Sequence, residues 1–188
     1  MSLKGIVMIA AACCTWVSCK KVPDTVSVSQ TRELTMWDSG SNPLVPVMPP
    51  QWRRVPGTEL RLYNYRFGKG SQEGEIYISK ARGGVLPNAN RWLGQFGQAP
   101  LTSTDGLPTV KVLDSQGVLL EATGKFGGGM GKAPIENAGL IGVIADLGSE
   151  GLLVVKMIGP AEAVQKEKQR VIDFCQSIRI NPSALEGN

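Results

Sequence analysis

Two dense apolar runs near the carboxyl end of the chain constrain its fold more than any other feature. Residues 140–147 (LIGVIADL) and 152–158 (LLVVKMI) are separated by the short turn-like segment GSEG at 148–151. A strand with one face in water alternates apolar and polar residues, but both runs are apolar at odd and even positions. We therefore expect an antiparallel hairpin inside a sheet that is covered on both faces.

The segment that follows, residues 161–178, changes to the spacing of an amphipathic helix. The face expected to be exposed to solvent carries Gln165, Lys166, Glu167, Gln169, Arg170 and Asp173. Its apolar stripe consists of Ala161, Val164, Val171, Cys175 and Ile178, with Ile172 beside it. Pro160 suits the first helical turn, where a missing N–H costs no hydrogen bond. These features predict a C-terminal helix packed on the sheet.

The composition argues against several classes of function. The chain has 20 basic and 16 acidic side chains, a net charge of +4, and no dense Lys/Arg run, so we expect no nucleic-acid partner. It contains no histidine, the commonest general base and metal ligand. Its carboxylates are scattered without the spacing of a calcium loop. We therefore expect no metal, no cofactor and no catalytic residue, although a hydrolytic carboxylate pair such as Glu75 with Glu121 stays open.

The amino end predicts export and attachment to a membrane. Residues 1–18 have the cation and the short apolar stretch of a secretory signal, and that stretch is too short to span a bilayer. The VSC motif that ends at Cys19 resembles the lipobox of bacterial lipoproteins, although Trp16 stands where that family usually has leucine. Cys13, after three alanines, is a competing match. The resemblance implies acylation of Cys19 and a lipoprotein of the cell envelope that faces the periplasm or the exterior.

The remaining chain divides by composition into a tether, one domain and a tail. Residues 19–50 are rich in Ser, Thr and Pro, as in extended spacers. Residues 51–181 have the length and apolar content of one domain, and residues 182–188 form a tail.

Within the domain, alternation and turn residues predict further elements. A lead-in strand starts at Trp52. The other predicted elements are a hairpin of 59–67 with 75–80, a helix over 87–96, strands over 109–113 and 117–123 around a turn at 114–117, and a glycine-rich loop over 124–134.

Residues 88–101 (NANRWLGQFGQAPL) carry a resemblance to a known family. An Asn-Arg-Trp helix that follows Gly-Gly and precedes Pro is similar to a segment of uncharacterised envelope lipoproteins of planctomycete and verrucomicrobial bacteria. The order of elements from Trp52 to Ile180 also resembles the PsbP-like fold. That resemblance implies an α/β/α sandwich with a mainly antiparallel sheet, a fold that serves mostly as a binding or accessory module.

The candidate binding residues lie on the middle helix and in the glycine-rich loop. Trp92 and its neighbours Asn90, Arg91 and Gln95 either pack and tie down loops, which we favour, or form a small recognition patch. The loop fails the spacing of a phosphate-binding P-loop, but Phe126 and Met130 offer an adaptable contact surface.

From these patterns we expect a non-catalytic accessory or binding module, anchored in the membrane by lipid and contacting another envelope protein. Two alternatives remain. One is a carboxylate-based hydrolase of an envelope polymer, and the other is a small-ligand binder that uses Trp92 with the aromatic face of Tyr63, Tyr65 and Phe67.

Overall fold

The structure is a computed structural model that describes residues 42–58, 60–127 and 133–182, all of which belong to the compact unit formed by residues 38–188. The strands of its main sheet are β2 (Arg53–Arg54), β3 (Tyr63–Phe67), β4 (Gly74–Ala81), β5 (Thr109–Val112), β6 (Ser115–Phe126), β7 (Ile135–Asp146) and β8 (Leu152–Pro160). Their spatial order is β2-β3-β4-β8-β7-β6-β5, and every neighbouring pair is antiparallel.

The predicted hairpin of β7 and β8 lies inside this sheet, as expected from its two apolar faces. Residues 138–145 and 152–159 are all buried. The connection is a short 3₁₀ turn, Gly148–Glu150, flanked by left-handed backbone at Gly148 (φ 66°) and Gly151 (φ 81°). Only glycine adopts that backbone without strain, so these glycines fix the reversal of the chain.

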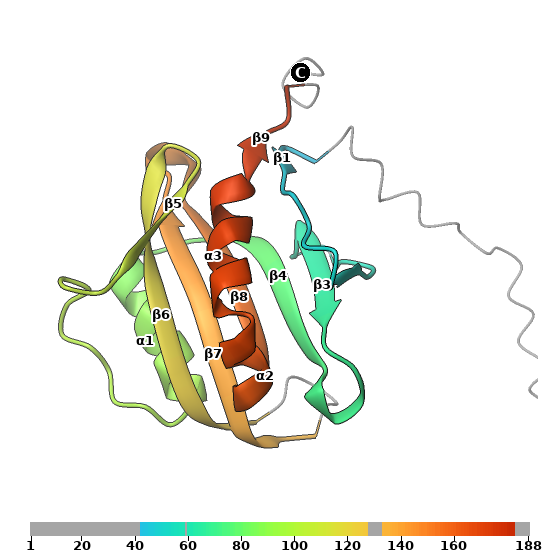
Figure 1. The fold of residues 1–188 in the computed structure, drawn as a ribbon. Helices are drawn as coiled ribbons and strands as arrows, with labels where there is room; N and C mark the ends of the chain where they lie inside the picture. The colour runs from blue at the N-terminus through green and yellow to red at the C-terminus, as the bar shows by residue number, and fades with distance from the viewer. Residues whose placement is uncertain (1–41, 59, 128–132, 183–188) are drawn as a thin grey trace, which may run out of the picture. The chain divides into compact units, whose positions relative to one another are not determined.

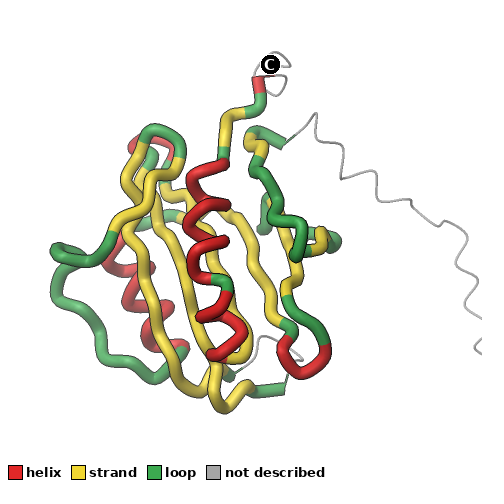
Figure 2. Tube along the Cα trace, in the orientation of Figure 1, coloured by secondary structure: helices red, strands yellow, loops and turns green. Residues whose placement is uncertain are grey.

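Helices cover both faces of the sheet, which makes the fold an α/β/α sandwich (Figures 1 and 2). Helix α1 (Val85–Gln95) packs on one face with a core that includes Leu120, Leu140 and Val154. Helices α2 (Ala161–Lys166) and α3 (Lys168–Ser177) pack on the other face. The predicted fold class is therefore confirmed, with a large antiparallel sheet and C-terminal helices packed on it.

The C-terminal helix is divided at Glu167, where a single helix was predicted. The Glu167 N–H bonds the carbonyl of Val164, three residues back, at 3.0 Å, which tightens the turn. Its carboxylate accepts a hydrogen bond from Trp52 Nε1 at 2.8 Å and another from Arg170. Glu167 was predicted to lie on the solvent-exposed face of the helix, but these two hydrogen bonds hold its carboxylate against the domain.

The amino-terminal boundary of the domain lies earlier than predicted. Strand β1 (Leu44–Val45) pairs with β9 (Arg179–Ile180), and Leu44 is buried. The Leu44 carbonyl also accepts a hydrogen bond from the hydroxyl of buried Tyr63 at 2.6 Å. Residues 42–50, assigned from their composition to the tether, are therefore part of the fold. Pairing with a strand more than 130 residues away leaves no local signal in that composition.

Two loop predictions are also corrected. The β5–β6 turn lies at Leu113 and Asp114, with Leu113 in left-handed backbone (φ 55°), and Ser115 already pairs with Val112. Strand β6 continues to Phe126, so the first residues of the predicted glycine-rich loop are strand. Among the described residues, no helix has both the length and the apolar content needed to cross a membrane.

Candidate functional site

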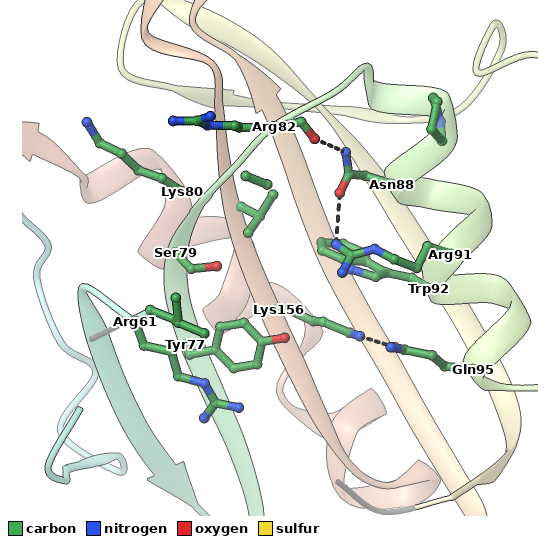
Figure 3. Close-up of a pocket in the computed structure, with 14 residues that line it drawn as sticks. Arg61, Tyr77, Ser79, Lys80, Arg82, Asn88, Arg91, Trp92, Gln95 and Lys156 are labelled. Carbon is green, nitrogen blue, oxygen red and sulfur yellow. Dashed lines mark hydrogen bonds between the residues drawn. The ribbon is translucent and has the colours of Figure 1, made fainter. Parts of the chain in front are cut away.

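A hollow lies beside helix α1, over strands β4 and β8 (Figure 3). Trp92 of α1 packs so closely on Gly142 of β7 that a Cβ there would lie 2.3 Å from its ring. The helix thus covers β6, β7 and part of β8, and the hollow opens beside it with a volume of about 570 Å³. Its polar lining residues are Arg61, Tyr77, Ser79, Lys80, Arg82, Asn88, Arg91, Gln95 and Lys156.

Strand alternation places Tyr77 and Lys156 on the floor of this hollow. The two residues are register partners on β4 and β8, so both side chains project toward α1. Their chain neighbours Ile76, Ile78 and Met157 project to the opposite face and are fully buried there. The apolar face of each strand therefore fixes the direction of its polar residues.

Lys156 is the only charged residue in the buried run of β8, and it is 2% exposed. Its Nζ donates a hydrogen bond to Gln95 Oε1 at 2.5 Å and lies 4.9 Å from the centroid of the Trp92 ring. Burial, together with the positive charges of Arg91 and Arg61, lowers the pKa of Lys156 to about 7, and Glu75 opposes this shift. At neutral pH the amine is therefore divided between its charged and neutral forms.

Glu75 forms ion pairs with two arginines at the edge of the site. Its carboxylate lies 3.2 Å from Arg61 and 3.6 Å from Arg66. The Arg61 guanidinium also stacks 3.9 Å from the centroid of the Tyr77 ring. Burial raises the pKa of Tyr77, so its phenol keeps its proton at neutral pH. Arg61 and Tyr77 thus line one side of the hollow, and Glu75 holds Arg61 from outside its lining.

Arg91 lies on the opposite wall and is held there by an amide. Its guanidinium donates to Asn88 Oδ1 at 2.8 Å, while the Asn88 amide nitrogen donates to the carbonyls of Arg82 and Gly84 at 3.0 Å each. Asn88 is buried, but Arg91 is exposed and keeps further N–H donors for a ligand. Asn88 therefore orients a guanidinium at the hollow without neutralising its charge.

The hollow is strongly positive. Among the described residues that line it there is no carboxylate. Five of these residues have cationic side chains: Arg61, Lys80, Arg82, Arg91 and Lys156. Planar guanidinium groups and a desolvated amine in one concave site suit a small anion, particularly a carboxylate or a phosphate. A second hollow of about 620 Å³ adjoins the first, and Lys156, Gln95 and Tyr77 line both.

The predicted binding residues do not all lie at the hollow. Arg91, Trp92 and Gln95 all line the hollow, although Trp92 is 2% exposed and serves mainly as core. Asn90 points elsewhere: its amide bonds the N–H and the carbonyl of Leu101, at 2.7 and 3.0 Å, and so ties down a loop. Phe126 stacks on Phe96 with centroids 5.2 Å apart and also lines the second hollow. Met130 and the proposed lipidation residue Cys19 lie outside the described residues.

Most polar residues of the site were not predicted, among them Lys156, Tyr77 and Arg61. A signal for Lys156 was present, because a single cation interrupts an otherwise apolar run predicted to be buried on both faces. Tyr77 and Arg61 carried no comparable signal, since a polar or aromatic residue on the second face of a strand is common.

The geometry does not bring together the particular residues named for either alternative function. Glu75 projects to the α1 face, whereas Glu121 projects to the opposite face, where it pairs with Lys168. The two carboxylates therefore cannot flank one bond, as glycoside hydrolysis requires. Tyr63, Tyr65 and Phe67 are buried against the C-terminal helices, on the face away from Trp92. The described residues also contain no group of three or more Cys, Asp and Glu that could hold a metal.

Cys175 was predicted to be a packing residue, and this is confirmed. It is 0% exposed in the core between α3 and the sheet. Burial raises the pKa of its thiol to about 12, which disfavours the nucleophilic thiolate.

Comparison with known proteins gives distant structural similarity alone. No family model matches the chain, and no curated protein matches it. The chain is similar to a crystal structure of a protein from Bacteroides thetaiotaomicron VPI-5482, with 12% identity and a TM-score of 0.42. The match covers 74% of this chain and 45% of that chain, so this chain spans less than half the length of the other protein.

Proposed function

We propose that the protein is a non-catalytic binding module that holds a small anionic ligand in the hollow between α1, β4 and β8. The observation that carries this proposal is the concentration of cations in this hollow, whose described lining has no carboxylate, whereas Glu73 and Glu75 line the adjoining one. A buried lysine is costly unless a partner compensates its charge, and the one acceptor that the described residues provide is the neutral amide of Gln95. A ligand anion would supply that compensation.

The walls of the hollow also favour an anion with an aromatic or other planar body. The Tyr77 ring, which carries Arg61 stacked on one face, lines the hollow, and Arg91 offers further N–H donors on the opposite side. Phenyl phosphate is therefore a suitable probe, and phenol is its matched neutral control.

Calorimetric titration of the purified protein with these two compounds tests the proposal. We expect saturable binding of phenyl phosphate that weakens with added salt, and much weaker binding of phenol. Arg91→Gln should reduce the affinity roughly tenfold or more, the effect of losing a charge-assisted hydrogen bond. Arg170→Gln on α3 is the matched control and should leave the affinity unchanged, because Arg170 lies on the far face and pairs with Glu167.

Equal binding of phenyl phosphate and phenol would contradict the proposal, and so would an Arg91→Gln protein with undiminished affinity.

We further propose that the domain is a lipoprotein of a bacterial cell envelope, anchored in the membrane through Cys19, where it contacts another envelope protein as an accessory component. The signal-like residues 1–18 and the lipobox resemblance support the anchor. In cells fed a labelled fatty acid, Cys19→Ala should abolish acylation and detergent partitioning, whereas Cys13→Ala should retain both. The opposite result would move the anchor to Cys13, and an unlabelled unmutated protein would exclude a lipid anchor.

A further inference from the structure

The amine of Lys156 is buried without a carboxylate partner in the described part of the chain, an environment that binding an anion does not by itself require. A lysine that only supplies charge is usually exposed or paired with a carboxylate, as Lys166 is with Glu162 on α2. Lys156 is 2% exposed, and among the described residues no carboxylate lies within ion-pair distance of it. Its single acceptor in the described structure is Gln95, an amide that leaves the amine able to lose its proton.

The charged groups around Lys156 favour the neutral amine. Arg91 approaches from α1 and Arg61 from the segment before β3, and both repel an ammonium ion. Glu75 on β4 acts against them, but its carboxylate already pairs with Arg61 and Arg66. With a pKa of about 7, roughly half of the molecules carry a neutral amine at pH 7. For a lysine in water the neutral share is only about one in three thousand.

The amine is also placed where a ligand could reach it. Lys156 lines both adjoining hollows, and the phenol of Tyr77, its register partner, lies on the same floor (Figure 3). The phenol keeps its proton at neutral pH because burial raises the pKa of Tyr77. A nucleophilic amine, a proton donor and an anion-binding guanidinium therefore share one site.

We infer that the hollow captures an anionic aldehyde or ketone, whose carbonyl group forms a reversible imine with Lys156 while Arg91 holds its anionic group. This inference rests on the proposed anion-binding function and names the ligand class of the same site. It does not require turnover, since the imine is formed and hydrolysed reversibly.

The chemistry balances without an oxidant or a reductant. The lone pair of neutral Nζ attacks the carbonyl carbon, an N–C bond forms, and the C=O π electrons move to oxygen. The oxygen takes a proton, which Tyr77 can supply, and the nitrogen loses one, giving a carbinolamine. A second protonation releases the hydroxyl as water while the nitrogen lone pair forms the C=N bond. Tyr77 regains its proton from the nitrogen, so one carbonyl compound and one amine give one imine and one water.

Pyridoxal 5′-phosphate and pyridoxine 5′-phosphate test this inference on the purified full chain. The two probes share the phosphate and the ring, but only the first carries an aldehyde. After borohydride reduction and peptide mapping, we expect saturable labelling of Lys156 by pyridoxal 5′-phosphate at low concentration. The exposed Lys166 should label only in proportion to the probe concentration, and it serves as the internal reference. Pyridoxine 5′-phosphate should compete for Lys156 without forming an adduct.

Variants and pH separate imine formation from simple anion binding. Lys156→Arg keeps a cation but should abolish the saturable adduct, and Arg91→Gln should weaken labelling of Lys156 roughly tenfold. The labelling rate of Lys156 should level off above about pH 7.

Binding of pyridoxine 5′-phosphate without a reducible adduct on Lys156 would overturn this inference and leave the proposed anion-binding function standing. If neither probe binds and no adduct forms, both proposals fail. Labelling of Lys156 that is no more saturable than that of Lys166 would also overturn the inference.

Discussion

Replacing Lys156 with methionine should stabilise the folded domain most at low pH and progressively less as the pH rises. Methionine has a similar length and fills the same buried space with an apolar chain. The substitution removes an amine that burial and two arginines hold at a pKa of about 7, against an ordinary value of 10.5. Because the unfolded chain binds this proton more tightly than the folded chain, the group makes the folded state less stable at acid pH than at alkaline pH.

The size of the effect follows from these two pKa values. Below pH 7 both states carry the proton, and the cost to folding is roughly 5 kcal/mol, since each tenfold change in proton affinity corresponds to about 1.36 kcal/mol. The cost decreases as the pH rises from 7 toward 10.5. Between pH 6 and pH 9 the wild-type free energy of unfolding should therefore increase by roughly 2–3 kcal/mol from this group alone.

Urea unfolding of both proteins at pH 6, 7, 8 and 9 measures this difference directly. We expect the stability advantage of Lys156→Met to shrink by roughly 2–3 kcal/mol across the series, with a corresponding change of about 5–10 °C in the difference between melting temperatures. Lys166→Met is the matched control, because it makes the same replacement at a lysine that is exposed on α2. A difference between wild type and Lys156→Met that is the same at pH 6 and pH 9 would refute the reasoning.

Three further substitutions or truncations test the fold. Val171→Asp should prevent folding, as judged by circular dichroism, because it places an unpaired carboxylate at a fully buried position under α3. Gly142→Ala should destabilise by about 1–3 kcal/mol in urea unfolding because its methyl group overlaps Trp92, whereas Gly94→Ala, which meets nothing within 4 Å, should be neutral or stabilising. A fragment that begins at residue 42 should melt at a higher temperature than one that begins at residue 51, because only the former keeps buried Leu44. Equal melting temperatures would show that β1 contributes nothing to stability.

Much of the architecture could be predicted because it depends on local periodicity. The runs at 140–147 and 152–158 are apolar on both faces, so burial on both sides of a sheet follows from their composition. The helix that became α1 was predicted at 87–96 and spans 85–95, because its apolar spacing and its flanking glycine and proline are local signals. Pairing of β3 with β4 likewise follows from a short connection between alternating segments.

The strand pairing of β1 with β9 and the division of the helix at Glu167 could not be predicted in this way. Each depends on a partner far along the chain: Ile180 for Leu44, and Trp52 for the carboxylate of Glu167. Composition identified the Pro-rich segment before residue 50, but composition alone does not show whether such a segment docks on the domain.

The candidate site depends still more on tertiary structure. The absence of histidine, the apolar faces and the unusual lysine in LLVVKMI are properties of the sequence, and they restrict the chemistry that the domain can perform. Whether two polar residues meet depends instead on the face of the sheet to which each projects, and a shift of one residue in register reverses that face. Register places Lys156 beside Gln95, 61 residues away in the chain, and sends Glu75 and Glu121 to opposite faces. Local sequence determined the strands and helices, while long-range packing decided which of their side chains share a hollow.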